Sequence, residues 1–242
     1  MTEKNELPDG YSFSLPKPPP PGAKTMSFEE VEGELLIIAA EREAQLRQAY
    51  YKLVVLYHET GRYDKELVYI QTLIGMATNV GEKAHYFLTL GQLMEKLSDF
   101  AAAVDYYTQA RALEPVDQQV WYFIHNNLGY SLNMLGRYDE GEHYCRLALR
   151  INPKLYNAHK NLGMALEGQN RPSEAAACYI EAVKADATNQ RAFHHLENLL
   201  QKTPNLLKEN PLLANELENA RQATGFAQKT VQDLLDKYYQ PD

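Results

Sequence analysis

The apolar residues of this chain recur at spacings of three and four positions from about residue 27 onward. Such spacing gathers apolar side chains on one face of an α-helix. At the start of the pattern, Ser27 is placed to act as an N-cap and Glu30 to complete a capping box. We therefore expect an all-α protein that begins with one long helix and reaches its first turn at Gly61. The apolar stripe of that helix comprises Val31, Leu35, Ile38, Leu46, Ala49, Leu53 and Tyr57.

The pattern repeats along the chain. The segment NNLGYSLNMLGRYDEGEHYCRLALRINP is followed by NLGMALEGQNRPSEAAACYIEAV in nearly the same order, so that Asn127 corresponds to Asn161, 34 residues later. The turn sequence GRYD occurs at Gly61 and again at Gly136, and a degenerate copy starts at Ser98 between them. Four copies of one unit therefore lie in tandem. Glycine or a polar residue at each turn, with small residues at fixed places in the flanking helices, predicts a helical hairpin for each copy.

These repeats resemble the tetratricopeptide repeat (TPR) family, whose order of aromatic, Leu-Gly, Ala, aromatic, Ala and Pro positions is matched best over residues 87–115 and 125–153. The resemblance covers roughly residues 47–202. It implies a right-handed superhelical solenoid of helix-turn-helix repeats with flanking N- and C-terminal helices. The chain departs from the family pattern at His125 and His159, where the family often has tryptophan.

Two segments flank the predicted array. Residues 1–26 contain the run SLPKPPPPG, which cannot form a regular hydrogen-bonded element and predicts a disordered, proline-rich leader. A ligand for a proline-reading domain is the alternative interpretation of this run. We expect the TPR array over 27–202, with the long first helix, about four repeats and a capping helix. A loop and one amphipathic helix, weakened at Gly225, are expected over 203–242, with the apolar face of the helix buried against the array or a partner.

The composition narrows the function classes. The 242 residues carry a formal net charge of −8, which argues against nucleic acid as a partner because phosphate contacts need a basic surface. No apolar run is long enough to insert in a membrane, and the first residues lack a secretory signal, so a cytoplasmic location is expected. Cys145 and Cys178 lie on apolar faces of predicted helices, where reduced, buried thiols are expected.

No motif for catalysis or cofactor binding is present in the sequence. It has no phosphate-binding glycine loop, paired cysteine motif or nucleophile elbow. Among the seven histidines, His125 and His159 are 34 residues apart, which indicates a packing position of the repeat, and the adjacent His194 and His195 cannot share a helix face. We therefore expect no enzyme activity, no metal site and no cofactor.

The resemblance implies where a partner would bind, because in this family the first helix of each hairpin lines a concave groove that contacts bound peptides. Asparagine is frequent on that face, and a side-chain amide can pair with the backbone of any extended peptide. Asn127 and Asn161 are similar to the asparagine ladder of O-linked N-acetylglucosamine transferase repeats, whereas Asn161 and Arg191 partly match the carboxylate clamp of chaperone-binding repeats. A merely solvated concave surface is the alternative. The candidate groove residues are Asn126, Asn127, Tyr130, Asn133, Asn157, Lys160, Asn161, Met164, Arg191, His195 and Asn198, preceded by Lys52, Val55, Thr89 and Gln92.

Two functions remain in competition at the level of sequence. The first is a non-catalytic protein–protein interaction module, an adaptor or chaperone-like protein that binds an extended peptide segment of a partner in the groove. In that case Lys160 and Arg191 would attract acidic segments. The alternative is a self-associating structural scaffold, in which the long first helix and the terminal helix pair between chains. A homo-oligomer is the less favoured arrangement, because both helices can bury their stripes within one chain.

Overall fold

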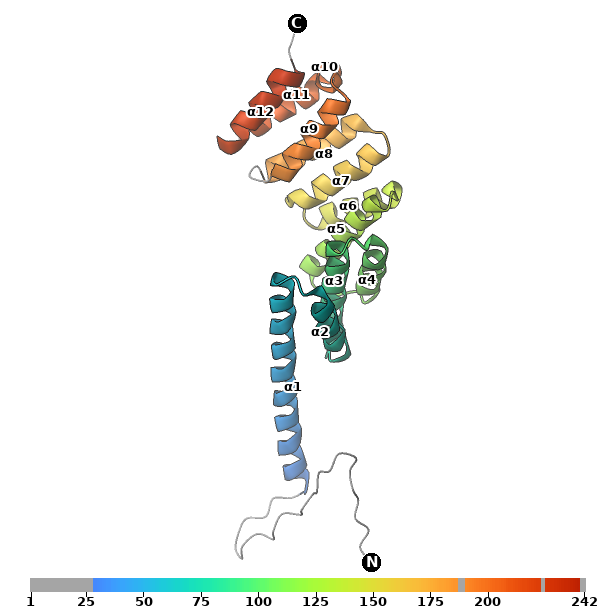
Figure 1. The fold of residues 1–242 in the computed structure, drawn as a ribbon, viewed down its shortest axis with the longest axis vertical. Coiled ribbons are helices and arrows are strands. Elements are labelled where there is room, and N and C mark those ends of the chain that lie inside the picture. Colours follow the sequence, from blue (N-terminus) through green and yellow to red (C-terminus); the bar gives the residue numbers. More distant parts are fainter. Residues whose placement is uncertain (1–27, 187–189, 223–224, 240–242) are drawn as a thin grey trace, which may run out of the picture. The chain divides into compact units, whose positions relative to one another are not determined.

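In a computed structural model of the chain, the residues described are 28–186, 190–222 and 225–239. Their regular elements are all α-helices (Figure 1). Contacts divide the chain into two units, residues 1–48 and 49–242, and α1 runs from one into the other. The helices are α1 (Phe28–Glu59), α2 (Tyr63–Gly75), α3 (Val80–Lys96), α4 (Phe100–Ala112), α5 (Gln118–Met134), α6 (Tyr138–Ile151), α7 (Tyr156–Gly168), α8 (Pro172–Ala185), α9 (Gln190–Lys202), α10 (Leu206–Glu209), α11 (Pro211–Gln222) and α12 (Gly225–Tyr238).

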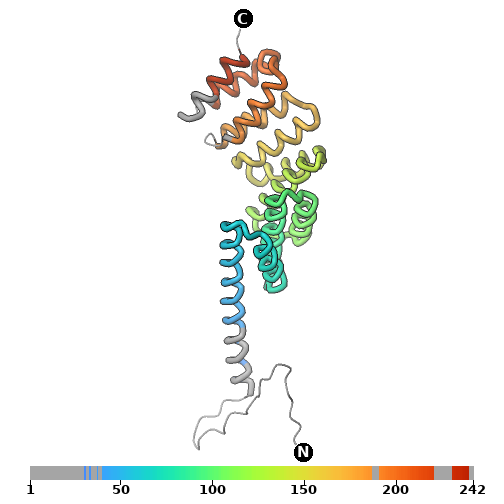
Figure 2. The backbone as a smooth tube through the Cα atoms, in the orientation of Figure 1, coloured from blue at the N-terminus to red at the C-terminus, as the bar shows by residue number. Residues whose placement is uncertain are grey.

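The second unit is the array expected from the repeat. Its backbone passes through helical hairpins that stack in chain order (Figure 2). The hairpins pair α3 with α4, α5 with α6 and α7 with α8, and each first helix also contacts the first helix of the next pair. This arrangement confirms the all-α superhelical solenoid of helix-turn-helix repeats. No helix in the described ranges combines the length and the apolar character needed to cross a membrane.

Each hairpin turn contains one residue in the left-handed backbone region. These residues are Gly61, Ser98, Gly136 and Asn170, with φ angles of 69°, 62°, 75° and 59°. A left-handed residue lets the helix end and the chain reverse direction within a few residues. Glycine adopts this conformation without strain, and asparagine tolerates it better than most residues. The four turn positions read from the sequence therefore coincide with the four helix reversals.

Small residues allow the two helices of a hairpin to cross closely. The glycines of the Leu-Gly pairs are Gly91, Gly129 and Gly163 in successive first helices. A Cβ atom added at Gly91 would overlap the ring of Tyr107, and one added at Gly163 would overlap the ring of Tyr179. Both tyrosines are fully buried. The aromatic ring of the second helix thus packs against the bare backbone of the first, which explains the small residue at this position of each repeat.

The C-terminal segment differs from the single amphipathic helix expected over 203–242. It contains the short helix α10 and two helices, α11 and α12, that pack against each other. Gly225, expected only to weaken one helix, is the first residue of α12. The break is stabilised by burial, because Leu217 of α11 and Val231 of α12 both lie in one core cluster with Leu196 of α9. The array therefore does not end at α9, which was expected to cap it.

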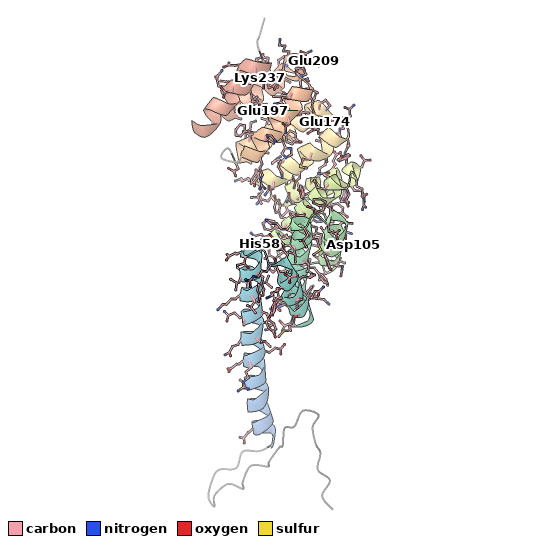
Figure 3. The ribbon with its side chains drawn as sticks, in the orientation of Figure 1. His58, Asp105, Glu174, Glu197, Glu209 and Lys237 are labelled. Carbon is pink, nitrogen blue, oxygen red and sulfur yellow. The ribbon has the colours of Figure 1, made fainter. Side chains whose placement is uncertain are left out.

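Polar contacts also hold the C-terminal helices against the array. Lys184 of α8 pairs with Glu216 of α11. Lys237 of α12 lies 3.7 Å from Glu197 of α9, and both residues are labelled in Figure 3. These exposed pairs contribute little to stability individually. The apolar face of the C-terminal segment is thus buried within the chain, which answers the choice left open between the array and a partner.

The stripe expected along α1 is only partly buried. In the first unit Leu46 is exposed, and in the second unit Ala49 is exposed while Leu53 and Tyr57 are partly buried. Val54, which the stripe did not include, is the buried residue of this helix. The expected N-cap Ser27 and the side chains of Val31, Leu35 and Ile38 lie outside the described residues.

We expect that replacing Ala148 with leucine lowers the free energy of unfolding by roughly 2 kcal/mol, because overpacking a close helix crossing forces neighbours apart. Ala148 is fully buried against Tyr122 and Ala158. The measurement is urea denaturation followed by circular dichroism. The matched control is Ala101 to leucine on an exposed face of α4, which should change stability by no more than about 0.5 kcal/mol. Equal stability of the Ala148 variant and the wild type would contradict the close-crossing argument.

Candidate functional site

A groove of about 400 Å³ opens on the first helices of the array. Seven of the eleven candidate residues line it together: Asn126, Asn127, Tyr130, Asn157, Lys160, Asn161 and Arg191. They come from α5, α7 and α9, and Gln92 of α3, also expected on this face, joins them. The remaining lining residues are His58, Glu95 and Lys96. The spacing of the repeats thus brings polar side chains from successive first helices onto one surface.

The asparagines of this surface are hydrogen-bonded to one another across the helices. Asn161 Nδ2 donates to Asn126 Oδ1 over 3.0 Å, and Asn126 Nδ2 donates to Asn127 Oδ1 over 2.9 Å. Asn133 Nδ2 donates to the backbone oxygen of Asn161 over 2.8 Å. Asn161 is only 2% exposed. These amides therefore link α5 to α7, whereas the sequence suggested that they would be available to the backbone of a peptide.

The groove contains a partly buried cation. Lys160 is 8% exposed, and its Nζ lies 5.4 Å from the centre of the Tyr130 ring. Burial disfavours the charged form and, together with the nearby Arg191, lowers the pKa of Lys160. A cation held in low-dielectric surroundings attracts an anion more strongly than one in water does. Lys160 is thus placed to bind a carboxylate that enters the groove, with Lys96 and Arg191 nearby.

Glu95 is the acidic residue of the groove. Burial raises its pKa to about 7, although hydrogen bonds with Ser131 and Tyr107 and the charge of Lys160 act in the opposite direction. Ser131 Oγ donates to Glu95 Oε1 over 2.8 Å. At neutral pH the Glu95 carboxyl therefore carries only part of its negative charge. The charge of the groove is positive, with three cationic side chains against one partly protonated carboxyl.

Four candidate residues do not line the groove. Asn133 is buried in its bond to Asn161, and Met164 packs against the C-terminal core cluster. His195 stacks on Tyr179 with 5.4 Å between ring centres, and burial lowers its pKa. Asn198 is partly buried on α9 and is also absent from the groove lining. The structure therefore limits the predicted site to its central part.

The histidine expected to pack in the scaffold does so. His125 is buried and stacks between Trp121 and Tyr144, with ring centres 5.0 and 5.9 Å away. Burial lowers its pKa to about 4, so it is neutral at physiological pH. No group of three or more histidine, cysteine, aspartate or glutamate side chains in the described ranges is arranged to hold a metal ion. Cys145 is buried and Cys178 partly buried, and both are free thiols.

Two groove residues missed from the sequence share one position of the repeat. His58, Glu95 and Asn133 are separated by 37 and 38 residues, the same steps that separate the hairpin turns. Asn133 was a candidate, so applying the period to it would have identified Glu95 and His58. Lys96 carries no such signal, because it is the last residue of α3 and reaches the groove through the position of the helix end.

A solenoid of helical hairpins with a polar groove on its first helices is the class of protein that the fold and the site define. Sequence comparison agrees with it. A profile of the tetratricopeptide repeat matches residues 88–155, and a second profile of the same repeat matches residues 48–79 and 156–189. The chain belongs to the tetratricopeptide repeat family. Members of this family are generally non-catalytic modules that bind protein or peptide partners.

Two curated relatives show the same repeats. The chain is 28% identical over 108 residues to the small glutamine-rich tetratricopeptide repeat-containing protein 2 of Mycosarcoma maydis. It is 25% identical over 173 residues to a TPR repeat-containing protein of Methanocaldococcus jannaschii. These alignments cover 45% and 68% of the chain. They span only 30% and 29% of the relatives, respectively.

Solved structures share the fold at low sequence identity. MamA, residues 41 to the end, from Desulfovibrio magneticus RS-1 matches with a TM-score of 0.56 and 15% identity, over 80% of this chain and 97% of that one. A chain of the APC/C hetero-tetramer Cut9-Hcn1 matches with a TM-score of 0.56 and 18% identity, over 64% of this chain and 30% of that one. These likenesses support the solenoid architecture.

Proposed function

We propose that the protein is a non-catalytic interaction module that binds an extended, acidic segment of a partner protein in the groove of α3, α5, α7 and α9. The observation that carries the proposal is the convergence of Lys96, Lys160 and Arg191 on one concave surface. The protein as a whole has a net charge of −8, so a positive groove stands out against an acidic background. Such a local charge raises the encounter rate with an acidic segment and fixes where it docks.

The asparagines have a different role in this proposal from a direct peptide ladder. Because Asn126 and Asn161 hydrogen-bond to each other, they hold α5 and α7 at the spacing that sets the groove. Asn157 lines the groove without being fully buried, and it is therefore the amide best placed to contact a peptide backbone. Tyr130 provides an apolar surface beside the cation of Lys160.

The proposal predicts salt-sensitive binding of an acidic probe. A capped hexa-aspartate peptide, titrated into the protein in a calorimeter, should bind at low ionic strength and lose affinity as salt is added. Arg191 to glutamine and Lys160 to methionine should each weaken binding by about tenfold, the loss expected for one partly buried charge pair. Methionine keeps the length of the lysine stem, so the packing on Tyr130 changes little.

The matched control for this experiment is Lys154 to glutamine. Lys154 is exposed and lies outside the groove, so its loss removes the same charge without removing a contact. If the control and the groove variants lose affinity equally, the effect is one of overall charge and the groove is not the binding site. Absence of any binding to the wild type at low salt would reject the acidic partner.

A further inference from the structure

The first hairpin departs from the other repeats at the helix crossing. In the second helices of the other hairpins, the position nearest the crossing is occupied by small residues, Ala103, Gly141 and Ala175. One period earlier, the corresponding residue is Glu66. The first helix departs in the same way, because Val54 stands where the later repeats have Gly91, Gly129 and Gly163. Two larger side chains therefore occupy a crossing that elsewhere has none.

Glu66 is buried at this crossing. It is 1% exposed, and its carboxylate oxygens lie 3.0 and 3.2 Å from His58 Nδ1. Burying a carboxylate is costly unless it is paired, and the half-exposed His58 ring is the partner seen here. A carboxylate can accept about four hydrogen bonds, so one histidine nitrogen leaves much of its capacity available.

A cavity of about 310 Å³ lies beside this pair, between α1, α2 and α3. Its walls include the apolar side chains of Val54, Val55 and Leu93, and two carboxylates, Glu59 and Glu66, also line it. Among the described residues that line it, none is a lysine or an arginine. The full lining is Tyr51, Val54, Val55, His58, Glu59, Glu66, His85, Thr89, Gln92 and Leu93. An apolar shaft with carboxylates is complementary to a long basic side chain, which has an aliphatic stem and a cationic end.

The cavity adjoins the positive groove. His58 and Gln92 line both, so a segment bound in the groove can extend directly into the cavity. His58 lies near the C-terminal end of α1, on the part of that helix that belongs to the second unit (Figure 3). The binding surface is thus positive around Lys160 and Arg191 and negative around Glu59 and Glu66.

We infer that the bound segment carries charges of both signs, with a lysine or arginine side chain inserted in the cavity of Glu66 and an acidic residue on Lys160 and Arg191. The inference rests on the proposed function. Neighbouring first helices lie about 8–10 Å apart, and an extended peptide advances about 3.3 Å per residue. Two helix steps separate α3 from α7, so the basic and acidic residues of the segment are separated by about six positions.

The test uses capped octapeptides with two aspartates at one end, a lysine at the other and a neutral glycine-serine spacer, made in both orders. Two reference peptides replace the lysine by glutamine or the aspartates by asparagine. In calorimetric titrations at low salt, one order of the bipolar peptide should bind about tenfold more tightly than the reference peptide that keeps only the aspartates. Glu66→Gln should remove that gain and leave the affinity for the aspartate-only peptide unchanged.

A second variant keeps the test valid if Glu66→Gln disturbs the fold. Glu59→Gln, at an exposed position of the cavity, should also reduce the gain from the lysine while circular dichroism stays that of the wild type. The control is Asp105→Asn, which removes the same charge from an exposed position on α4, outside both surfaces (Figure 3). It should leave the gain intact.

The outcomes separate this inference from the proposed function. If the aspartate-only and bipolar peptides bind equally well in both orders, the cavity does not take a cation and the inference is wrong, while the acidic groove stands. The inference is also wrong if Glu66→Gln and Glu59→Gln weaken both peptides alike. If no peptide with aspartates binds to the wild type, the proposed function fails, and the inference fails with it.

Discussion

Replacing Gly129 with valine is expected to lower the free energy of unfolding by about 3 kcal/mol or more, the upper part of the range for overpacked cores. Gly129 lies where α5 crosses α6. An added Cβ atom would overlap Cys145 Sγ and would stand 3.1 Å from both the backbone nitrogen of Cys145 and the backbone oxygen of Gly141. A side chain can rotate away, but two backbone atoms of the neighbouring helix can move only if the helices separate.

The measurement is denaturant unfolding of purified protein, with Gly75 to alanine as the control. Gly75 is the last residue of α2, and a Cβ atom there meets nothing within 4 Å. Alanine should therefore be neutral or slightly stabilising at this position, by up to about 1 kcal/mol. If the Gly129 variant unfolds at the same denaturant concentration as the wild type, the close crossing of α5 and α6 is not what the repeat pattern requires.

The period of the repeat predicted most of the fold because the turns and crossings are local features. Gly61, Ser98, Gly136 and Asn170 could be located by their spacing, and each is the left-handed residue of a turn. The C-terminal helices could not be predicted in this way. A glycine such as Gly225 is compatible with either a weakened helix or a break, and the choice depends on whether two shorter helices bury more apolar surface against α8 and α9.

The candidate site was predicted with the correct helix faces but without the depth of each side chain. Asn127 and Arg191 line the groove as expected, whereas Asn133 is buried between helices. Helical spacing states which residues point to the same side, and the tilt of neighbouring helices decides how far each is covered. For the same reason, the sequence suggested a ladder of amides open to a peptide, and the structure shows Asn126 and Asn161 joined to each other.

The first repeat shows a different limit. Val54 and Glu66 were visible as departures from the repeat, since the missing glycine after Leu53 was part of the sequence pattern. What they produce is a cavity with a buried carboxylate, and no rule of spacing gives that result. It follows from three helices that cannot approach closely at one crossing.

Changing Glu95 to glutamine is expected to stabilise the protein at pH 8 by about 2 to 3 kcal/mol and to have little effect at pH 4.5 or below. Burial raises the pKa of Glu95 from 4.5 to about 7 in the folded protein. The native state therefore binds this proton more tightly than the unfolded state does. The stability that the protonated carboxyl provides is fully present below pH 4.5, decreases as the pH rises from 4.5 to 7, and is lost above 7.

Glutamine resembles the protonated carboxyl, and its side-chain oxygen can still accept the hydrogen bond from Ser131. The measurement is urea unfolding of both proteins between pH 4.5 and 8, because the difference between them cancels the titration of all other groups. The control is Glu142 to glutamine. Burial of Glu142 is outweighed by hydrogen bonds from Gln169 and Arg146, which lower its pKa, so its loss should destabilise the protein at neutral pH. A difference between wild type and the Glu95 variant that is constant over this range would show that the carboxyl keeps an ordinary pKa, since only a pKa that differs between the folded and unfolded states makes that difference depend on pH.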